Sequence, residues 1–335
     1  MKLLHISDLH LVKDGDRKAY QQHIKGRFIE FIQQVTDIRK SALGIAIDHI
    51  IITGDLQDAK SSSIVDPDLM VDLVYDFIYD IVSAAGVDSA RNVHIVPGNH
   101  EVKREKDRDT WEQKNDQFNA FFHKFCDRFY GYEHNPWRGE DGRKPCTFVL
   151  CEGAGGDGKS GKAGFVYVNS ALDCTDSKSD WRNKLGLHPD VFSILHKHGS
   201  EVDQFIILAH HPLSWISDES RKSLESVLAK RMDNTKRVYW LSGHNHDTKA
   251  QEIISRPNFT PVTIGSLMGF HGEFYELPDF AVHGVLDEGS LRVYRFLPHL
   301  NLSSDLSVAP GGWKLIPSTG AELYPSQNIL LTPKI

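Results

Sequence analysis

The chain has 335 residues, 40% hydrophobic and 25% charged, which is the ordinary composition of a globular protein with one large domain or two smaller ones. Its formal net charge of −7 argues against nonspecific electrostatic binding to DNA or RNA. No stretch reaches the roughly 18 consecutive apolar residues of a membrane helix. A strand pattern that begins at Lys2 leaves no room for a signal peptide, so we expect a cytoplasmic protein.

In chain order, apolar periodicity predicts strands that alternate with helices. The predicted strands are 2–6, 49–52, 93–96, 146–151, 165–169, 204–208 and 237–241, followed by β-like runs at 252–254, 261–264, 280–286 and 291–296. The predicted helices are 17–43, 67–86, 110–130, 190–198 and 218–232. Residues 153–164 are expected to form an exposed loop or hairpin. This order of elements predicts two packed sheets with helices outside.

The four cysteines show no CxxC spacing, so neither a zinc knuckle nor a disulfide framework is supported. They are Cys126, Cys146, Cys151 and Cys174. We expect all four to be reduced and structural.

Five predicted strands each end in a cluster of metal-binding side chains. The clusters are Ser7-Asp8-Leu9-His10, Gly54-Asp55-Leu56-Gln57-Asp58, Gly98-Asn99-His100-Glu101, His210-His211-Pro212 and Gly243-His244-Asn245-His246. Ligands of open α/β sheets bind just outside the carboxyl ends of the strands. The five clusters are therefore predicted to converge on one metal site.

A pair of divalent metals needs one anionic ligand that bridges them, together with separate ligands for each metal. Asp55 is the best candidate for the bridge. Asp8 and His10 alternate along an extended segment, so both side chains point to one side and can hold one metal together. The other candidate ligands are Asn99, His210, His244 and His246. Singly, each residue could be a cap, a turn residue or a core histidine, but such needs do not explain their restriction to one sheet edge.

Taken in order, Asp8-x-His10, Gly54-Asp55, Gly98-Asn99-His100-Glu101, His210-x-Pro212 and Gly243-His244-x-His246 resemble the motifs of the calcineurin-like metallophosphoesterase superfamily. The resemblance covers about residues 2–270. It implies an α/β fold, namely a four-layer αββα sandwich of two mixed β-sheets flanked by helices, with the metal site at the carboxyl ends of the strands. It also implies two ligand sets, Asp8, His10, Asp55 and His246 for the first metal and Asp55, Asn99, His210 and His244 for the second.

The resemblance further implies a role for the residues around these ligands. His100 is expected to protonate the leaving alkoxide while a metal-bound hydroxide attacks the phosphate ester in line. Asp58 and Glu101 are expected either to orient His10 or His100 or to satisfy loop amides. His10 is expected either to bind a metal directly or to assist a ligand.

Two further side chains each carry two interpretations. His211 is expected to support a ligand or to be packed. Trp215 is expected to stack on a base or an aromatic leaving group, or to pack under the following helix.

The expected function is hydrolysis of a phosphodiester or phosphomonoester by a dinuclear metal-dependent phosphoesterase. The N-terminal HISDLHL segment resembles that of bacterial cyclic-nucleotide phosphodiesterase-like members, which favours a small nucleotide-like diester. The alternatives are a DNA or RNA nuclease, disfavoured by the net charge, a protein Ser/Thr phosphatase, and a non-catalytic scaffold. The ligands suit Mn²⁺, Fe²⁺ or Zn²⁺, and Mn²⁺ is the first choice for assays.

Residues 1–285 are expected to form the metallophosphoesterase domain, with an insert at about 102–164. Residues 286–335 are expected to form a C-terminal extension packed on the same domain. Both additions are expected to cover the metal cleft or to form an oligomer contact. The expected partner is a small phosphate-ester substrate, with no membrane.

Overall fold

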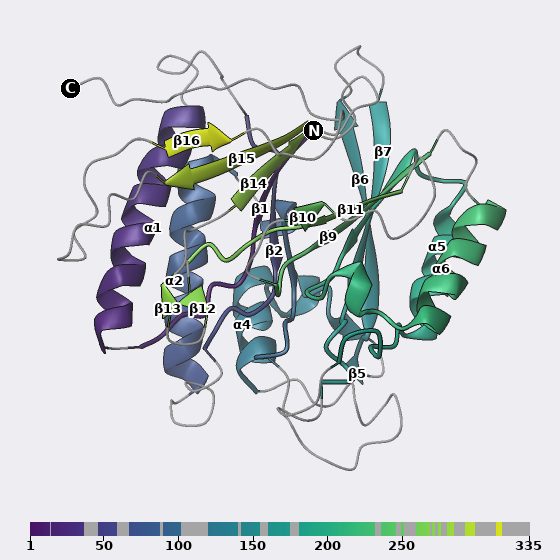
Figure 1. Cartoon of the computed structure of the whole chain (residues 1–335), viewed down its shortest axis with the longest axis horizontal. Coiled ribbons are helices and arrows are strands. Elements are labelled where there is room, and N and C mark those ends of the chain that lie inside the picture. Colours follow the sequence, from purple (N-terminus) through teal and green to yellow (C-terminus); the bar gives the residue numbers. More distant parts are fainter. Residues whose placement is uncertain are drawn as a thin grey trace.

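The architecture is a sandwich of four layers, with helices, a sheet, a second sheet and helices in that order (Figure 1). The computed structural model describes residues 1–13, 15–36, 46–58, 67–87, 90–101, 120–139, 142–154, 160–174, 181–231, 236–245, 249–250, 259–268, 270–271, 274–275, 280–284, 292–298 and 313–316. The predicted α/β, four-layer αββα fold with two mixed sheets is confirmed.

The first sheet has the strand order β16-β15-β14-β1-β2-β3. Three strands run parallel, and three more extend the sheet with antiparallel pairing. The parallel strands are β1 (Lys2–Ile6), β2 (His49–Thr53) and β3 (Val93–Val96), and the antiparallel ones are β14 (Phe280–Gly284), β15 (Arg292–Pro298) and β16 (Trp313–Ile316). β1 to β3 are rich in buried Leu, Ile and Val because both of their faces are covered, and their polar residues His5, His49, Thr53 and His94 are buried as well.

The second sheet has the strand order β10-β11-β9-β8-β7-β6. Its four central strands are parallel, and an antiparallel strand closes each edge. The central strands are β7 (Ser160–Val168), β8 (Gln204–Leu208), β9 (Arg237–Ser242) and β11 (Phe259–Thr263), and the edge strands are β6 (Cys146–Ala154) and β10 (Lys249–Ala250).

Helices cover the outer faces of both sheets (Figure 1). Beside the first sheet lie α1 (Gly15–Thr36), α2 (Pro67–Ala85) and α4 (Ala120–Tyr130), and beside the second lie α5 (Pro189–His198) and α6 (Asp218–Arg231). α2 carries apolar residues at helical spacing, and its Val74, Phe77 and Ile78 are fully buried in the core.

Alternation along the strands separates two hydrophobic cores. On β7, Ala163, Phe165 and Tyr167 belong to the core that includes the first sheet, whereas Val166 and Val168 pack with residues of α5 and α6. Successive strand residues point to opposite faces, so one strand contributes to both cores. Side chains from the odd-numbered positions of β7 therefore meet the first sheet.

Short elements connect the layers. They are η2 (Ala90–Asn92), η3 (Tyr132–His134), η4 (Leu213–Trp215), the pair β4 (Arg138–Gly139) and β5 (Gly142–Arg143), and the pair β12 (Phe270–His271) and β13 (Phe274–Tyr275).

Some sequence expectations differ in extent from the structure. β6 and β7 pair antiparallel up to residue 154 and from residue 160, so the hairpin of the two alternatives expected at 153–164 is found, and the two strands are longer than the predicted 146–151 and 165–169. Residues 37–43 of the first predicted helix, 110–119 of the third and the β-like run at 252–254 lie outside the described residues.

The expected insert and extension contain elements of the sandwich. α4 packs against α2, β6 and the start of β7 lie in the second sheet, and β15 and β16 continue the first sheet. The domain boundaries at 285 and around 102–164 stay predictions.

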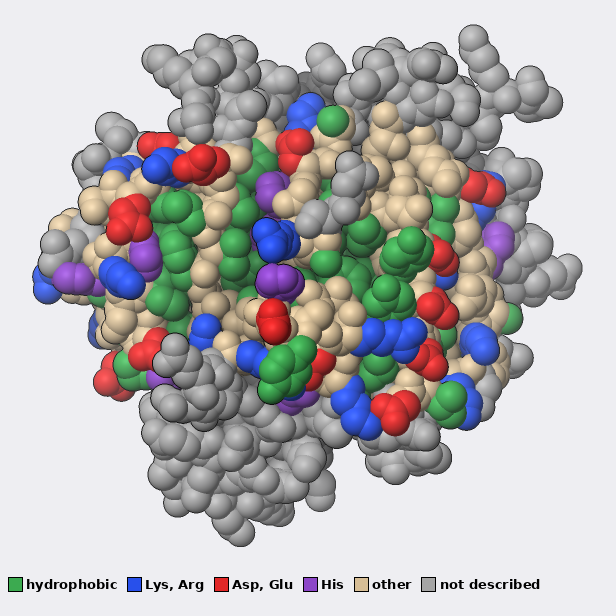
Figure 2. Space-filling view, turned by 180° about the vertical axis from the view of Figure 1, so that it is seen from behind, with side chains coloured by type: hydrophobic (Ala, Val, Ile, Leu, Met, Phe, Trp, Pro, Cys, Tyr) green, Lys and Arg blue, Asp and Glu red, His purple; other side chains and the backbone are tan. Residues whose placement is uncertain are grey.

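None of the helices in the described part of the chain is both long and apolar enough to cross a bilayer. On the face shown in Figure 2, basic and acidic side chains are intermixed.

Candidate metal centre

Five loops meet where β1, β2, β3, β8 and β9 end, and backbone hydrogen bonds join them. The amide of Asp8 donates to the carbonyl of Gly54 at 3.1 Å, and the amide of His10 donates to the carbonyl of Asp55 at 2.9 Å. Across the two sheets, the amide of His244 donates to Oδ2 of Asp8 at 2.9 Å. The five strand ends therefore converge as predicted, and hydrogen bonds to backbone amides hold their loops together.

Four predicted ligands have left-handed backbone conformations. Their φ angles are 53° for Asp8, 43° for His10, 50° for Asp55 and 72° for His244, and within the described residues only Asn183 is a fifth such non-glycine residue. This region of φ and ψ is unfavourable for residues with a Cβ, and such strain concentrates at functional sites. The strain at these positions indicates that the backbone is shaped to aim these side chains.

Two glycines allow the loops to approach one another closely. A Cβ at Gly98 would lie 2.1 Å from Oδ1 of Asp55, and a Cβ at Gly243 would lie 1.8 Å from Oγ of Ser7. No side chain larger than hydrogen fits at either position without displacing the site. The glycines of the Gly-Asn and Gly-His motifs are therefore needed for close packing.

Asp55 occupies the middle of the cluster. Its Oδ2 lies 3.4 Å from Nε2 of His210 and 3.8 Å from Nε2 of both His10 and His100. Asp55 belongs to two groups whose potential ligand atoms lie within 4.8 Å of one another, one with Asp8 and His210 and one with His10 and His100. This position between two ligand groups is the one that a bridging carboxylate requires.

His210 points its Nε2 into the cluster. Its Nδ1 donates to the carbonyl of Thr53 at 2.7 Å, because a carbonyl can only accept. In the neutral ring Nε2 is therefore unprotonated, and it lies 3.0 Å from both Oδ1 of Asn99 and Nδ1 of His244. A backbone acceptor that fixes the tautomer in this way is typical of a metal-binding histidine.

The charges of Asp55 and His210 depend on each other. Burial alone would raise the pKa of the Asp55 carboxyl, but His100 and His210 hold it well below its usual range. Burial alone would lower the pKa of His210, but the Asp55 carboxylate raises it to about 9. The metal-free centre thus retains a proton as its positive charge, and a bound cation would replace that proton.

Asp8 and His10 lie together as predicted, although the extended segment on which the prediction rested is absent, since both residues have a positive φ. Both side chains are buried, and Nε2 of His10 lies 3.7 Å from Oδ1 of Asp8. The ring of His10 also meets that of His100, with centroids 4.7 Å apart. Nε2 of His10 thus faces the two carboxylates, which is the orientation of a direct ligand.

Glu101 binds backbone rather than either imidazole. Its fully buried carboxylate accepts hydrogen bonds from the amides of Asp55, Leu56, Gln57 and Gly98 at 2.8–3.4 Å. Burial and the adjacent Asp55 carboxylate raise the pKa of Glu101 to about 8. Of its two expected roles, the structure gives Glu101 that of satisfying loop amides, which holds the loops after β2 and β3 together.

The other residues around the centre differ in burial and in partners. Nδ1 of His100 donates to the carbonyl of Gln57 at 3.1 Å, and its side chain is 18% exposed. Asp58 forms an ion pair with Arg17 at 2.6 Å. His211 is buried behind the centre, where Nδ1 lies 3.0 Å from Oγ of Ser170, and its ring packs 4.4 Å from that of His244.

Two backbone groups that orient histidines at this site were not predicted from the sequence. The carbonyls of Thr53 and Gln57 orient His210 and His100, respectively. Backbone carbonyls leave no signal in residue type, so the sequence could not reveal them. His246, the last predicted ligand, lies outside the described residues.

The side chains fit a pair of divalent metals. Carboxylate oxygens, an amide oxygen and imidazole nitrogens converge from five loops, with one carboxylate common to two groups. Such mixed oxygen and nitrogen donors suit Mn²⁺, Fe²⁺ or Zn²⁺. Asp8, His10, Asp55, Asn99, His210 and His244 are therefore candidate ligands on geometric grounds as well.

Comparison with known proteins finds one curated relative and several solved structures that are similar to this chain. A curated relative, the uncharacterized metallophosphoesterase-like protein YydB of Bacillus subtilis (strain 168), is 22% identical over 326 residues and covers 89% of this chain, which spans 59% of the relative's length. A dimetal phosphatase from Danio rerio has a TM-score of 0.53 at 14% identity and covers 88% of this chain and 94% of its own. YfkN, a calcineurin-like phosphoesterase from Bacillus subtilis, has a TM-score of 0.43 at 14% identity and covers 94% of this chain and 87% of its own.

A protein-family model matches this chain over most of its length, not only at the motifs. The model, described as calcineurin-like phosphoesterase, matches residues 1–248. That span includes all five clusters at the strand ends. The chain therefore belongs to the calcineurin-like phosphoesterase family.

Proposed function

We propose that this protein is a metal-dependent phosphoesterase that hydrolyses a small nucleotide-like phosphodiester. The observation that carries the proposal is the position of Asp55, whose carboxylate is common to two adjacent ligand groups. Two divalent cations held there would offset the negative charge of a phosphoester and activate a water for in-line attack. The protein's own residues would then position the ester and supply a proton.

His100 is the proposed proton donor. The carbonyl of Gln57 holds Nδ1–H, so Nε2 remains to carry the proton that the leaving alkoxide needs. Nε2 lies 3.8 Å from the proposed bridge Asp55, and the side chain is partly open to solvent. These contacts support the proposal that His100 donates a proton to a bound ester.

The surroundings of His244 support a nucleotide as the organic part of the substrate. The indole of Trp215 meets the ring of His244 edge to face, with centroids 4.3 Å apart, and is only partly buried. The guanidinium of Arg182 lies 5.6 Å from the centre of the same indole. An aromatic surface beside a cation suits a base joined to a phosphate.

Hydrolysis of bis-p-nitrophenyl phosphate and of p-nitrophenyl phosphate by Mn²⁺-loaded protein tests the proposal. We expect a preference for the diester, and we expect Asp55→Ala to lose both bound metal and activity. His100→Ala is expected to keep its metals and lose on the order of 10²–10⁴ in rate. Preference for the monoester would make the protein a phosphatase, and no Asp55-dependent activity on either ester would favour the scaffold alternative.

The organic part of the substrate needs a separate test. With adenosine cyclic phosphate as substrate, Trp215→Ala is expected to raise KM about 10-fold, as expected for loss of one base-stacking contact. Trp215→Phe, which keeps an aromatic face, serves as the matched control and should change KM much less. Equal KM values for all three proteins would remove Trp215 from substrate recognition.

A further inference from the structure

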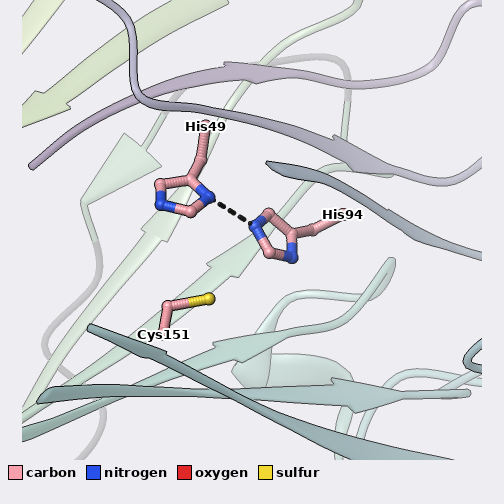
Figure 3. Close-up of side chains that lie close together, drawn as sticks. All are labelled: His49, His94 and Cys151. Carbon is pink, nitrogen blue, oxygen red and sulfur yellow. Dashed lines mark hydrogen bonds between the residues drawn. The ribbon is translucent and has the colours of Figure 1, made fainter. Parts of the chain in front are cut away.

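A second group of metal-binding side chains lies between the two sheets, away from the carboxyl ends of the strands. It consists of His49 on β2, His94 on β3 and Cys151 on β6 (Figure 3). Ile51 pairs with His94, so His49 and His94 lie on the same face of the first sheet. Cys151 pairs with Ala163, which pairs with Gln204 at the start of β8. The group therefore sits at the sheet edge opposite the candidate dinuclear centre.

The three potential ligand atoms face one another. They all lie within 4.8 Å of each other, and Nδ1 of His49 is 2.9 Å from Nε2 of His94. Figure 3 shows the thiol of Cys151 turned toward the two rings. His94 is fully buried, His49 is 8% exposed and Cys151 is partly exposed. The two histidines are thus buried, and solvent reaches the group at Cys151, where a metal ion could enter.

Hydrogen bonding and stacking account for only part of this arrangement. A single shared proton joins the two imidazoles, and His94 stacks on Phe165 with centroids 4.0 Å apart. Neither contact requires a cysteine from the other sheet within reach of both ring nitrogens.

The electrostatics of the group also suit a metal. Burial holds the pKa of His94 well below its usual value and lowers that of His49, so both rings are neutral and each keeps a lone pair. The hydroxyl of Tyr167 lies 2.5 Å from Nδ1 of His94. When the Tyr167 oxygen accepts a hydrogen bond from Nδ1–H, Nε2 of His94 is left as the ligand atom, with its orientation fixed as is usual for a histidine bound to zinc.

We propose that His49, His94 and Cys151 form a mononuclear Zn²⁺ site that joins the first sheet to the second. In tetrahedral coordination, Zn–N bonds of about 2.05 Å and a Zn–S bond of about 2.3 Å place the nitrogens about 3.3 Å apart and the sulfur about 3.6 Å from each. The two rings need to separate by only a few tenths of an ångström from their hydrogen-bonded positions. Water would complete the coordination on the exposed side, near Cys151.

Binding at this site releases a proton. Burial raises the pKa of Cys151 to about 11, so the thiol is protonated at neutral pH before the metal binds. Zn²⁺ forms a bond to the thiolate as the S–H bond breaks, and the proton passes to solvent. No oxidant or reductant is needed.

Titration of chelator-treated protein with Co²⁺ tests the proposal. A cysteine thiolate bound to Co²⁺ produces a sulfur-to-cobalt charge-transfer band, whereas the ligands proposed for the dinuclear centre are aspartate, asparagine and histidine. The near-ultraviolet band therefore distinguishes a cysteine-containing site from the dinuclear centre, and the cysteine variants show which thiol is bound. We expect one band that saturates with one equivalent of site-bound Co²⁺ and disappears when Zn²⁺ is added.

Variants decide which residues hold the metal. Cys151→Ala is expected to abolish the band, while Cys146→Ala should keep it, because Cys146 lies on the same strand but in the other hydrophobic core. His94→Gln and His49→Gln should each weaken Co²⁺ binding at least 10-fold, and Tyr167→Phe about 10-fold. Circular dichroism of each variant shows whether it is folded.

The outcomes separate this site from the dinuclear centre. Asp55→Ala is expected to retain the charge-transfer band, so failure of the proposed phosphoesterase function would leave this result unaffected. No band in folded wild-type protein, or a band that survives in Cys151→Ala, would overturn the proposal. A band that His49→Gln and His94→Gln both leave unchanged would also overturn it, since it would show Co²⁺ held by the cysteine alone.

Discussion

At the residue scale, the close packing around the candidate ligands limits which residues can neighbour them, as the need for metal-binding groups limits the ligands themselves. Gly98→Ala would place a methyl group against Asp55, with 2.1 Å between its Cβ and Oδ1. We expect this variant to lose about 2–3 kcal/mol in the free energy of unfolding and most of its bound metal, because Asp55 must move. Urea unfolding and elemental analysis measure the two effects.

Gly26→Ala is the matched control for that substitution. Gly26 lies inside α1, where an added Cβ meets no atom within 4 Å. It is expected to gain up to about 1 kcal/mol in stability, since alanine is the better helix former. Full metal content in Gly98→Ala would show that the glycine is not needed for the site.

Single residues also show how far sequence reasoning reached. The side chains of Asp8, His10, Asp55, Asn99, His210 and His244 were all predicted to converge, because a motif at a strand end depends only on local order along the chain. The carbonyls of Thr53 and Gln57 could not be predicted, since every residue has a carbonyl. His49, His94 and Cys151 share no motif, and only the packing of one sheet on the other brings them together.

At the scale of elements, one buried carboxylate connects two loops. Glu101→Gln replaces an acceptor oxygen with a donor NH₂ group that would face backbone amides from the loops after β2 and β3. The loss is expected to be about 3 kcal/mol in unfolding free energy, together with weaker metal binding. Calorimetry and Mn²⁺ titration measure these changes, and Glu133→Gln, an exposed position, should change neither.

The end of α4 is held by an ion pair whose strength depends on pH. Asp127 accepts hydrogen bonds from the guanidinium of Arg138 and from Asn135, and the hydrogen bonds from Arg138 are the main cause of its lowered pKa. A lowered carboxyl pKa contributes stability above the unfolded value of 3.8, and the contribution is lost as the pH falls through the lower folded value. Because the pair is partly exposed, the contribution should be below about 1 kcal/mol.

Asp127→Asn tests this dependence. The variant is expected to be less stable than wild type at neutral pH, and the difference should shrink toward zero in acid, where the wild-type carboxyl is protonated. Urea unfolding of both proteins at several pH values between about 7 and 3 measures it. A difference that does not change with pH would assign the effect to packing rather than to charge.

Longer-range pairing explains the errors in element length. The edge strand β6 continues to Ala154 because it pairs with β7 along its whole length, although Gly153 and the following glycines are typical of loops. Intrinsic preference was overridden by pairing in the sheet. The parallel strands β1, β2, β3, β8 and β9 were predicted closely because each contains a short run of buried apolar residues that ends at a motif.

At the scale of the whole molecule, metal binding is expected to stabilise the fold. The loops that carry Asp8, Asp55 and Glu101 bring three buried carboxyl groups together from the two strands β1 and β2 and from the turn after β3. Removal of metal by a chelator should lower the midpoint of thermal unfolding by about 5 °C, since metal at 100 times its Kd contributes about 2.7 kcal/mol. Mn²⁺ should restore the midpoint in wild type but not in Asp55→Ala, and equal midpoints with and without metal would contradict the expected coupling.

The left-handed backbone at Asp8, His10, Asp55 and His244 has a consequence for the evolution of this fold. Each position costs about 1 kcal/mol or more while a residue with a Cβ occupies it, and glycine would relieve that strain. Under the proposed function, selection for catalysis would keep these residues against selection for stability. In related proteins that have lost the proposed reaction, glycine or asparagine is expected to replace these residues early. The residues at these four positions in a related sequence would therefore distinguish an active enzyme from an inactive relative.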